Sequence, residues 1–225
     1  MPTLHLDFIS DIACPWCAVG LNSLERALAR IGDDIDISLH FQPFELNPQM
    51  QPEGADAVRY LCDKYGITPE QVARNQAAIR QRGAEVGFTF GTRSHVWNTF
   101  DAHRLLHWAG LEQAVDAGHV EQAAPAGAQR ALKHALLQAY HGEGRNPSDP
   151  AVLVELAAAA GLDAQRAAAV LAEGRYAEEV REAEARWQGA GIQSVPSLVI
   201  NGRHLIQGGQ PPEVFERALR QIAAT

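Results

Sequence analysis

Residues 4–17 have the sequence LHLDFISDIACPWC, in which an apolar segment runs into two cysteines separated by two residues. The segment from Leu4 to Ile9 is short and mostly apolar, as expected for a strand buried in a sheet. Proline is tolerated in a helix only in the first turn, so Pro15 indicates that a helix begins at the cysteine pair. The sequence therefore predicts that Cys14 lies where a strand gives way to a helix.

This position favours redox chemistry at the two cysteines. At a helix N-terminus, unpaired backbone N–H groups and the positive end of the helix dipole stabilise a thiolate. One helical turn separates Cys14 from Cys17, which brings their Cα atoms to roughly the 5–6 Å that a disulfide requires. We therefore predict that Cys14 attacks a partner disulfide and that Cys17 resolves the mixed disulfide. A structural zinc site and two inert buried thiols are the alternatives, although zinc normally needs four protein ligands and no second cysteine pair exists.

The residues after this pair predict a helix and a second strand. Apolar residues recur at intervals of three and four from Leu21 to Ile31, which is typical of a helix that buries one face, and the pattern ends at Gly32. Apolar and polar residues then alternate between Ile35 and Phe41, as they do in a half-buried strand. The chain therefore begins with a predicted βαβ unit.

Residues from about 54 to 191 form a block of different character, rich in Ala, Gln and Arg and poor in β-branched runs. Two places in it, Thr68-Pro69 and Asp149-Pro150, combine a capping residue with a first-turn proline. Cys62 follows Tyr60 and Leu61 in this block and is expected to be a buried helix residue. We therefore predict an all-helical insertion.

Strand signals return after this block. Leu198 to Ile200 is followed by Asn201-Gly202, the dipeptide that accepts the positive φ angles of a type I′ hairpin turn. A final helix is predicted to begin near Pro211-Pro212. The predicted fold class is α/β, with one domain built from residues 1–52 and 192–225 and a helical domain inserted at residues 53–191.

Val195-Pro196 precedes the third predicted strand, where a proline is tolerated because it need not donate to the sheet. An ordinary trans bond is one interpretation of this proline. The residues also resemble the thioredoxin superfamily, in which a cis-proline faces the CxxC pair, and within it the DsbA family and its cytoplasmic FrnE-like branch. The resemblance covers nearly the whole chain and is carried by residues 11–17, residues 43–48, residues 98–105, Val195-Pro196 and Gly208-Gly209-Gln210.

The resemblance implies a thioredoxin fold, βαβ…ββα with the insertion between its halves, and a thiol–disulfide oxidoreductase that oxidises, reduces or isomerises disulfides. It implies that substrate is bound by Pro15, Trp16, Val195, Pro196 and Gln210. Supporting roles are expected for Asp7, as a buried carboxylate that relays protons to the resolving cysteine, and for Trp97, Asn98 and His103, as residues that line the cleft. A solvated strand position for Asp7, and capping or packing roles for the other three, are equally open.

Two other functions are compatible with this architecture. Kappa-type glutathione transferases and 2-hydroxychromene-2-carboxylate isomerases share the insertion, but they usually have a serine where Cys14 stands and use glutathione as cofactor. A binding module that kept the fold without catalysis is the third hypothesis. The expected partners are protein thiols and disulfides or glutathione, with no metal and no tightly bound cofactor besides the redox-active disulfide Cys14–Cys17.

Composition narrows the partners and the compartment. The 225-residue chain is 46% hydrophobic and 20% charged, so it can bury a substantial core. Its formal charge of −8 provides no basic field, so neither nucleic acid nor an anionic membrane surface is expected as a partner. Residues 1–12 have no basic leader or signal-peptide run, and no stretch approaches the roughly 20 apolar residues that span a bilayer. We therefore expect a cytoplasmic protein, and no pattern specifies its oligomeric state.

Overall fold

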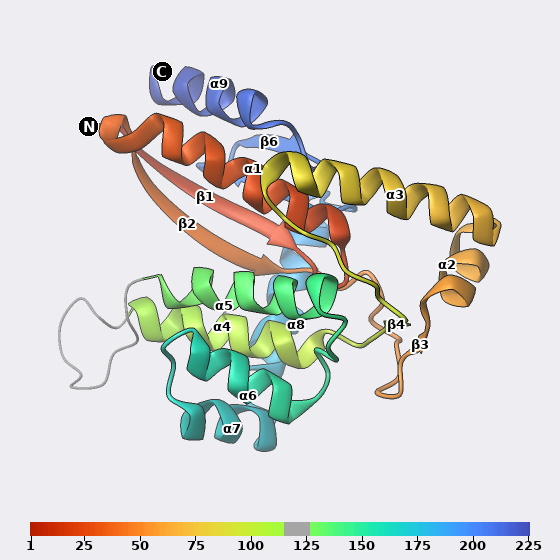
Figure 1. Cartoon of the computed structure of the whole chain (residues 1–225). Helices are drawn as coiled ribbons and strands as arrows, with labels where there is room; N and C mark the ends of the chain where they lie inside the picture. The colour runs from red at the N-terminus through yellow and green to blue at the C-terminus, as the bar shows by residue number, and fades with distance from the viewer. Residues whose placement is uncertain (115–126) are drawn as a thin grey trace.

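The computed structural model of the chain describes residues 1–114 and 127–225. It contains a four-stranded sheet with the strand order β2-β1-β5-β6 (Figure 1). Strand β1 pairs in parallel with β2 and antiparallel with β5, and β5 pairs antiparallel with β6. This topology confirms the predicted βαβ and ββα units. The strands are β1 (Thr3–Ser10), β2 (Asp36–Pro43), β5 (Ser197–Ile200) and β6 (His204–Gln207).

Helix α1 (Pro15–Ile31) begins and ends where its sequence signals predict. Cys14 is the N-cap residue, with an extended backbone at φ −88° and ψ 112°, and Pro15 occupies the first turn. Gly32 ends the helix at φ 57°, a left-handed value that glycine adopts without steric cost. The first cysteine is therefore held at the junction between strand and helix.

The last three elements also follow their local signals. Asn201 and Gly202 have φ values of 52° and 65°, and the Arg203 N–H donates to the Ile200 carbonyl at 3.0 Å, as in a type I′ turn. Helix α9 (Pro212–Ala223) buries Phe215 and Leu219 and packs beside α1 (Figure 1). We call β1, α1, β2, β5, β6 and α9 together the sheet half.

The insertion is helical over most of its length, but residues 115–126 of the predicted block lie outside the described residues. One feature differs from the prediction, because β3 (Ala55–Asp56) and β4 (His95–Val96) form a short antiparallel ladder that no sequence signal indicated. No helix in the described ranges is long and apolar enough to cross a membrane. The helices are α2 (Ala57–Tyr65), α3 (Pro69–Val86), α4 (Phe100–Ala114), α5 (Ala128–Leu137), α6 (Pro150–Ala159), α7 (Ala164–Ala172) and α8 (Ala177–Gly189), with a π-helical turn at Gln138–Gly142.

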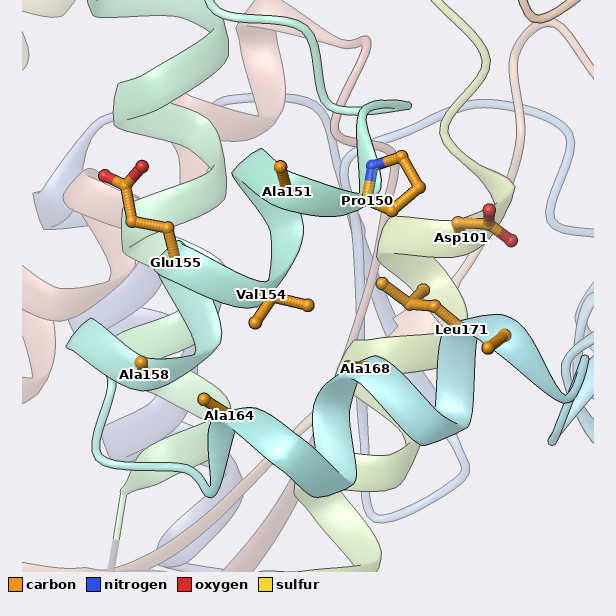
Figure 2. Close-up of a pocket in the computed structure, with 10 residues that line it drawn as sticks. Asp101, Pro150, Ala151, Val154, Glu155, Ala158, Ala164, Ala168 and Leu171 are labelled. Atoms are coloured by element: carbon orange, nitrogen blue, oxygen red, sulfur yellow. The ribbon is translucent and has the colours of Figure 1, made fainter.

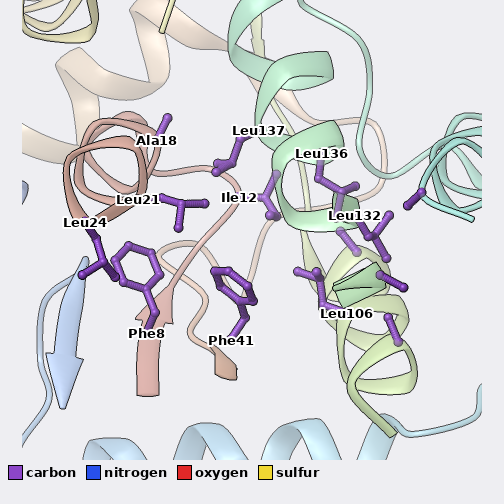
Figure 3. Packing of buried hydrophobic residues seen from close by; sticks show 14 of the residues in the cluster. Phe8, Ile12, Ala18, Leu21, Leu24, Phe41, Leu106, Leu132, Leu136 and Leu137 are labelled. Carbon is purple, nitrogen blue, oxygen red and sulfur yellow. The ribbon is translucent and has the colours of Figure 1, made fainter. Parts of the chain in front are cut away.

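One hydrophobic core runs from the sheet half into this helical insertion. Phe8 of β1 packs with Leu21 of α1, and the same buried cluster contains Leu132 and Leu136 of α5 (Figure 3). Ile12, which belongs to the loop just before the cysteines, lies between α1 and α5 in this cluster. Helix α5 is therefore held directly against the segment that carries the cysteine pair.

Candidate active site

Cys14 and Cys17 are both free thiols, but they occupy different surroundings. The Cys17 N–H donates to the Cys14 carbonyl at 3.0 Å, so the two residues form the first turn of α1. Cys14 lines a cavity that opens toward α2 and α3. Cys17 has 0% exposure and is not among the described residues that line the cavity. A molecule in the cavity therefore meets the Cys14 sulfur first.

The buried position of Cys17 determines its protonation. Burial raises the pKa of the Cys17 thiol far above its usual range, and the adjacent Cys14 sulfur raises it further. The positive charge of Lys133 and the backbone N–H of Asp11 oppose that rise. The Cys17 sulfur is consequently a protonated thiol at neutral pH when both cysteines are reduced.

The Val195-Pro196 segment faces the first turn of α1, and its peptide bond is cis. The Cys14 Sγ lies 3.5 Å from the Val195 carbonyl oxygen, to which the thiol can donate. A Cβ on Gly20 would lie only 2.9 Å from Pro196 Cγ, so this close approach requires a glycine in α1. The Gly208 N–H donates to the Pro196 carbonyl at 2.8 Å, which ties the loop after β6 to the same segment.

The carboxylate buried beside the cysteine loop belongs to Asp11. It is fully buried and accepts hydrogen bonds from the backbone N–H groups of Ala13 at 3.0 Å and Leu46 at 2.7 Å. The Thr99 hydroxyl donates to it at 2.8 Å, and His103 Nε2 lies 3.3 Å away. Burial alone would raise the pKa of Asp11, but the hydrogen bond and charge of His103 and the two N–H groups together hold this pKa below its usual range.

Of the two interpretations left open for Asp7, the fully buried carboxylate is therefore wrong. Asp7 is half-buried in β1, and its Oδ1 accepts a hydrogen bond from Gln42 Nε2 of the neighbouring strand at 2.6 Å. The polar–apolar alternation of the strand could not distinguish Asp7 from Asp11, because only the packing of the helical insertion against the loop buries Asp11. His103 was expected to line the cleft, but it lies beneath the cavity wall with 2% exposure.

Two side chains of the helical insertion hold the loop that leads into Cys14. His141, in the π-helical turn after α5, lies 2.8 Å through its Nε2 from the Ile12 carbonyl. Because a carbonyl oxygen only accepts, Nε2 must carry the hydrogen. Burial and the nearby charge of Arg93 lower the pKa of His141 to about 3, so this imidazole is neutral. Arg93 donates to the neighbouring Ala13 carbonyl at 3.2 Å.

Lys133 of α5 is a third group that the sequence analysis did not identify. Its side chain is fully buried, and burial lowers the pKa of its ammonium to about 8, although Cys17, Asp11 and Cys14 all act to raise it. A lysine in a helix is usually solvated, so its residue type argues against burial. A possible signal was its position between Gln129 and Leu137, each four residues away on the same face of the helix.

The cavity beside Cys14 has a volume of about 940 Å³, which suits a small molecule or a peptide segment. Cys14 lines one wall together with Pro15, Trp16 and Val195, three of the residues predicted to bind substrate, whereas Pro196 is not part of the described lining. Helices α2 and α3 and the segment before β4 form the opposite wall. The titratable and charged residues of the described lining, apart from Cys14, are Asp56, Tyr60, Lys64, Tyr65, Arg80, Arg93 and His141.

Three other expected site residues lie elsewhere. Trp97 stacks on His95, with ring centroids 4.9 Å apart. Asn98 Nδ2 donates to the Met50 carbonyl at 2.8 Å, and Gln210 Nε2 donates to the Gln207 carbonyl at 2.8 Å. The described cavity lining contains none of these side chains, because each is engaged in packing or in holding its own loop.

Cys62 in α2 is half-buried, not fully buried as the sequence predicted, and it does not line the described cavity wall. Within residues 1–114 and 127–225, no group of three His, Cys, Asp or Glu side chains is placed to hold a metal ion. A separate hollow of about 670 Å³ lies between α6 and α7 (Figure 2), and half of its described lining residues are alanines, with no cysteine or histidine among them. Of the three cysteines, Cys14 alone belongs to the described lining of the cavity at the start of α1.

Comparisons with known proteins cover nearly the whole chain. The family model described as a DSBA-like thioredoxin domain matches residues 5–220. The crystal structure of the probable DsbA oxidoreductase SCO1869 from Streptomyces coelicolor has 34% identity and a TM-score of 0.84, with 97% of this chain and 89% of that chain covered.

Two further solved structures are similar in fold. A 2-hydroxychromene-2-carboxylate isomerase has 16% identity and a TM-score of 0.66, covering 97% of this chain and 95% of its own. The cytosolic disulfide reductase DsbM from Pseudomonas aeruginosa, solved with GSH, has 20% identity and a TM-score of 0.62, covering 98% of this chain and 100% of its own. At these identities the likeness shows the fold alone.

Proposed function

The chain belongs to the family of DSBA-like thioredoxin domains, and from this membership we propose that it catalyses thiol–disulfide exchange through Cys14 and Cys17. The observation that carries the proposal is the unequal placement of the two sulfurs. Cys14 lines the cavity at the N-cap of α1, and Cys17 lies one turn deeper, fully buried and protonated. Such a pair divides naturally into an attacking thiolate and a resolving thiol.

In the reducing direction, the Cys14 thiolate attacks one sulfur of a substrate disulfide. The Cys14–substrate bond forms, the substrate S–S bond breaks, and the leaving sulfur departs as a thiolate that takes up a proton. Cys17 then loses its proton and attacks Cys14 Sγ, which forms the Cys14–Cys17 disulfide and releases the second substrate sulfur. Two electrons pass from the dithiol to the substrate, and the reverse sequence oxidises a substrate dithiol.

The segment at Val195 is proposed to position the substrate. Its carbonyl oxygen lies 3.5 Å from Cys14 Sγ and borders the cavity, so an extended substrate chain can pair with this backbone next to the reacting sulfur. Pro196 offers no N–H at the next position, and Gly20 allows the proline to lie directly against α1. Trp16 is partly exposed on the same cavity wall and supplies apolar contact area.

Glutathione is a second candidate substrate, and the charge of the cavity favours it. Lys64, Arg80 and Arg93 border the cavity, with Asp56 as the one acidic residue of the described lining. A small thiol with two carboxylates would be attracted to such a surface. In the cytoplasm, where the sequence predicts the protein to work, glutathione could then re-reduce the Cys14–Cys17 disulfide. A glutathione-dependent isomerase reaction remains the alternative from a different enzyme class.

A trapping experiment tests the main proposal. The Cys17→Ala variant is expected to accumulate a mixed disulfide at Cys14 with proteins or glutathione from a cell extract, because the resolving step is lost. Cys14→Ser should trap nothing and should lower the rate of insulin disulfide reduction by about a thousandfold or more. Non-reducing electrophoresis and mass spectrometry identify what is bound.

Cys62→Ser is the matched control, since it removes the third thiol, whose side chain is not part of the described cavity lining. This variant should keep full turnover. Proteins bound to Cys14 support a protein-disulfide oxidoreductase, whereas glutathione alone supports the small-molecule reaction. Turnover that survives Cys14→Ser would refute the proposal.

A further inference from the structure

Lys133 lies in α5, the helix of the insertion that packs beside the loop leading into the cysteines. It is fully buried in α5, and Leu137, one turn further along the same helix, packs against Ile12 of the loop before the cysteines (Figure 3). Lys133 therefore shares the helix face that is turned toward this loop. Burial of a charged ammonium costs free energy, which must be offset by nearby negative groups or reduced by loss of the proton.

Several titratable side chains interact electrostatically with Lys133. Cys17 and Cys14 of α1 and Asp11 of the preceding loop interact with its charge, and so does His141 from the π-helical turn. On α4, the neighbouring helix, His103 is engaged with Asp11. The outer face of α5 is separate from this set, because its basic residues Arg130 and His134 both pair with Glu25 of α1.

The choice of lysine is itself informative. Of the 19 basic Lys and Arg residues in the chain, only Lys64 and Lys133 are lysines, and the remainder are arginines. An arginine side chain keeps its proton at any physiological pH, whereas a buried lysine can release and take up a proton. Lys133 is therefore a buried cation that can become neutral, in a chain whose basic Lys and Arg residues are, apart from Lys64 and Lys133, all arginines.

We propose that Lys133 is the proton partner of Cys17 in the resolving step, a role that deepens the proposed thiol–disulfide exchange and depends on it. With Cys14 in a mixed disulfide, the neutral Lys133 amine takes the proton of the Cys17 thiol. The resulting thiolate attacks Cys14 Sγ, the Cys14–substrate bond breaks, and the substrate leaves as a thiolate. Lys133 afterwards returns its proton to solvent, and in the oxidising direction its ammonium protonates Cys17 as that sulfur leaves Cys14.

The pKa values of Cys17 and Lys133 are shifted in directions that favour proton transfer between them. A thiol whose pKa is raised far above its usual range is a poor nucleophile at neutral pH unless a nearby base accepts its proton. The pKa of Lys133, lowered to about 8, makes a neutral amine available in a minor fraction of molecules near pH 7. The opposed shifts therefore make proton exchange between the two groups feasible.

The experiment separates the two steps of a single turnover. In a Cys62→Ser background, the reduced protein is mixed with one equivalent of the chromogenic disulfide DTNB, and thiolate release is followed by stopped-flow absorbance. Cys14 attack releases one equivalent, and Cys17 resolution releases the second. Lys133→Met should shift the pH midpoint of the second phase upward by about one unit or more and slow that phase about tenfold at pH 7, because one unit is a factor of ten.

Arg130→Met is the matched control, since it removes a positive charge from the same helix on the exposed face. It should leave the midpoint of the second phase within about 0.3 units of the parent. Methionine matches lysine in length and is well suited to a buried site, so Lys133→Met should fold, as checked by circular dichroism and thermal unfolding. Lys133→Gln provides a second neutral variant.

A folded neutral variant with an unshifted second phase would overturn the assignment. If the parent protein itself shows no second phase, the proposed function fails, whatever the lysine does. A measurement on the native lysine adds an independent test, because ¹⁵N-lysine labelling gives signals from only two residues. The Lys133 titration midpoint should fall in Cys17→Ala, and a midpoint that stays in place would contradict the proton partnership.

Discussion

The sheet half and the helical insertion contribute different things to the same site. The sheet half provides both sulfurs, at the start of α1, and the Val195 carbonyl that faces Cys14. The insertion provides the charged and titratable groups around them, which are Arg93, His103, Lys133 and His141. The backbone of the sheet half therefore positions the two sulfurs, whereas the packing of the insertion sets their electrostatic surroundings.

Asp11 connects the two regions. Its carboxylate caps the backbone N–H of Ala13 within the sheet half, and the same carboxylate accepts hydrogen bonds from Thr99 and His103 of the insertion. The two halves therefore share one buried charge, and a change at Asp11 tests whether they depend on each other.

Asp11→Asn should have the largest effect on stability. Replacing the buried carboxylate leaves His103 without its charged partner and weakens several hydrogen bonds, so the free energy of unfolding should fall by about 3–5 kcal/mol. Urea denaturation at pH 7 measures the loss. A change below about 1 kcal/mol would show that the two regions do not depend on this carboxylate.

The same variant has a defined pH dependence. The pKa of Asp11 in the folded protein lies below its ordinary value of 3.8, so the folded state holds the anion more strongly than the unfolded chain does. This contribution to stability is present above the ordinary value and is lost as the pH falls through the folded value. The difference between parent and variant should therefore shrink as the pH is lowered below 3.8.

Gly20→Val should have a smaller effect that stays within the sheet half. A Cβ at this position would lie 2.9 Å from Pro196 Cγ, so α1 and the Val195-Pro196 segment must move apart. We expect the free energy of unfolding to fall by about 1–3 kcal/mol, together with slower insulin reduction. Thermal unfolding and turnover assays measure the two effects.

Gly189→Val is the control for that substitution, because a Cβ at the end of α8 meets no atom within 4 Å. Its stability should change by no more than about 0.5 kcal/mol. Equal losses in the two valine variants would mean that helix propensity, not the approach of Pro196, explains the effect.

Asp7→Asn should have the smallest effect. Asparagine keeps a carbonyl oxygen that can accept the hydrogen bond from Gln42, so stability should change by about 0.5 kcal/mol or less. Insulin reduction should remain at the parental rate across the pH range. A slower, pH-shifted turnover in this variant would restore Asp7 as the proton relay and would weaken the case for Lys133.

Local sequence signals predicted the elements that carry the sulfurs. Pro15 marked the first turn of α1, Gly32 marked its end, and Asn201-Gly202 marked the hairpin, and the structure has each of them at the predicted place. These signals are reliable because each depends on the φ angle or missing donor of the residue itself. The β3–β4 ladder had no such signal, since two-residue strands show no periodicity.

The surroundings of the sulfurs could not be predicted in the same way. Asp7 and Asp11 are both acidic residues in the segment before Cys14, and only the contacts with Thr99 and His103 show which of them is buried. Cleft-lining and packing roles were both open for Trp97 and Asn98, and in the structure their side chains hold neighbouring loops. A motif fixes the identity of such residues but not the direction of their side chains.

The sequence by itself determined the order of the elements and the position of Cys14 before Cys17 at the start of a helix, because these follow from local backbone preferences. Only the tertiary structure decided that Lys133 and His141 are buried beside the cysteine loop. A side chain 116 positions away from Cys17 affects its ionisation only through burial and charge, and both depend on how α5 packs against α1. The identity of the sulfurs is therefore a local property of this chain, and their reactivity is a property of its packing.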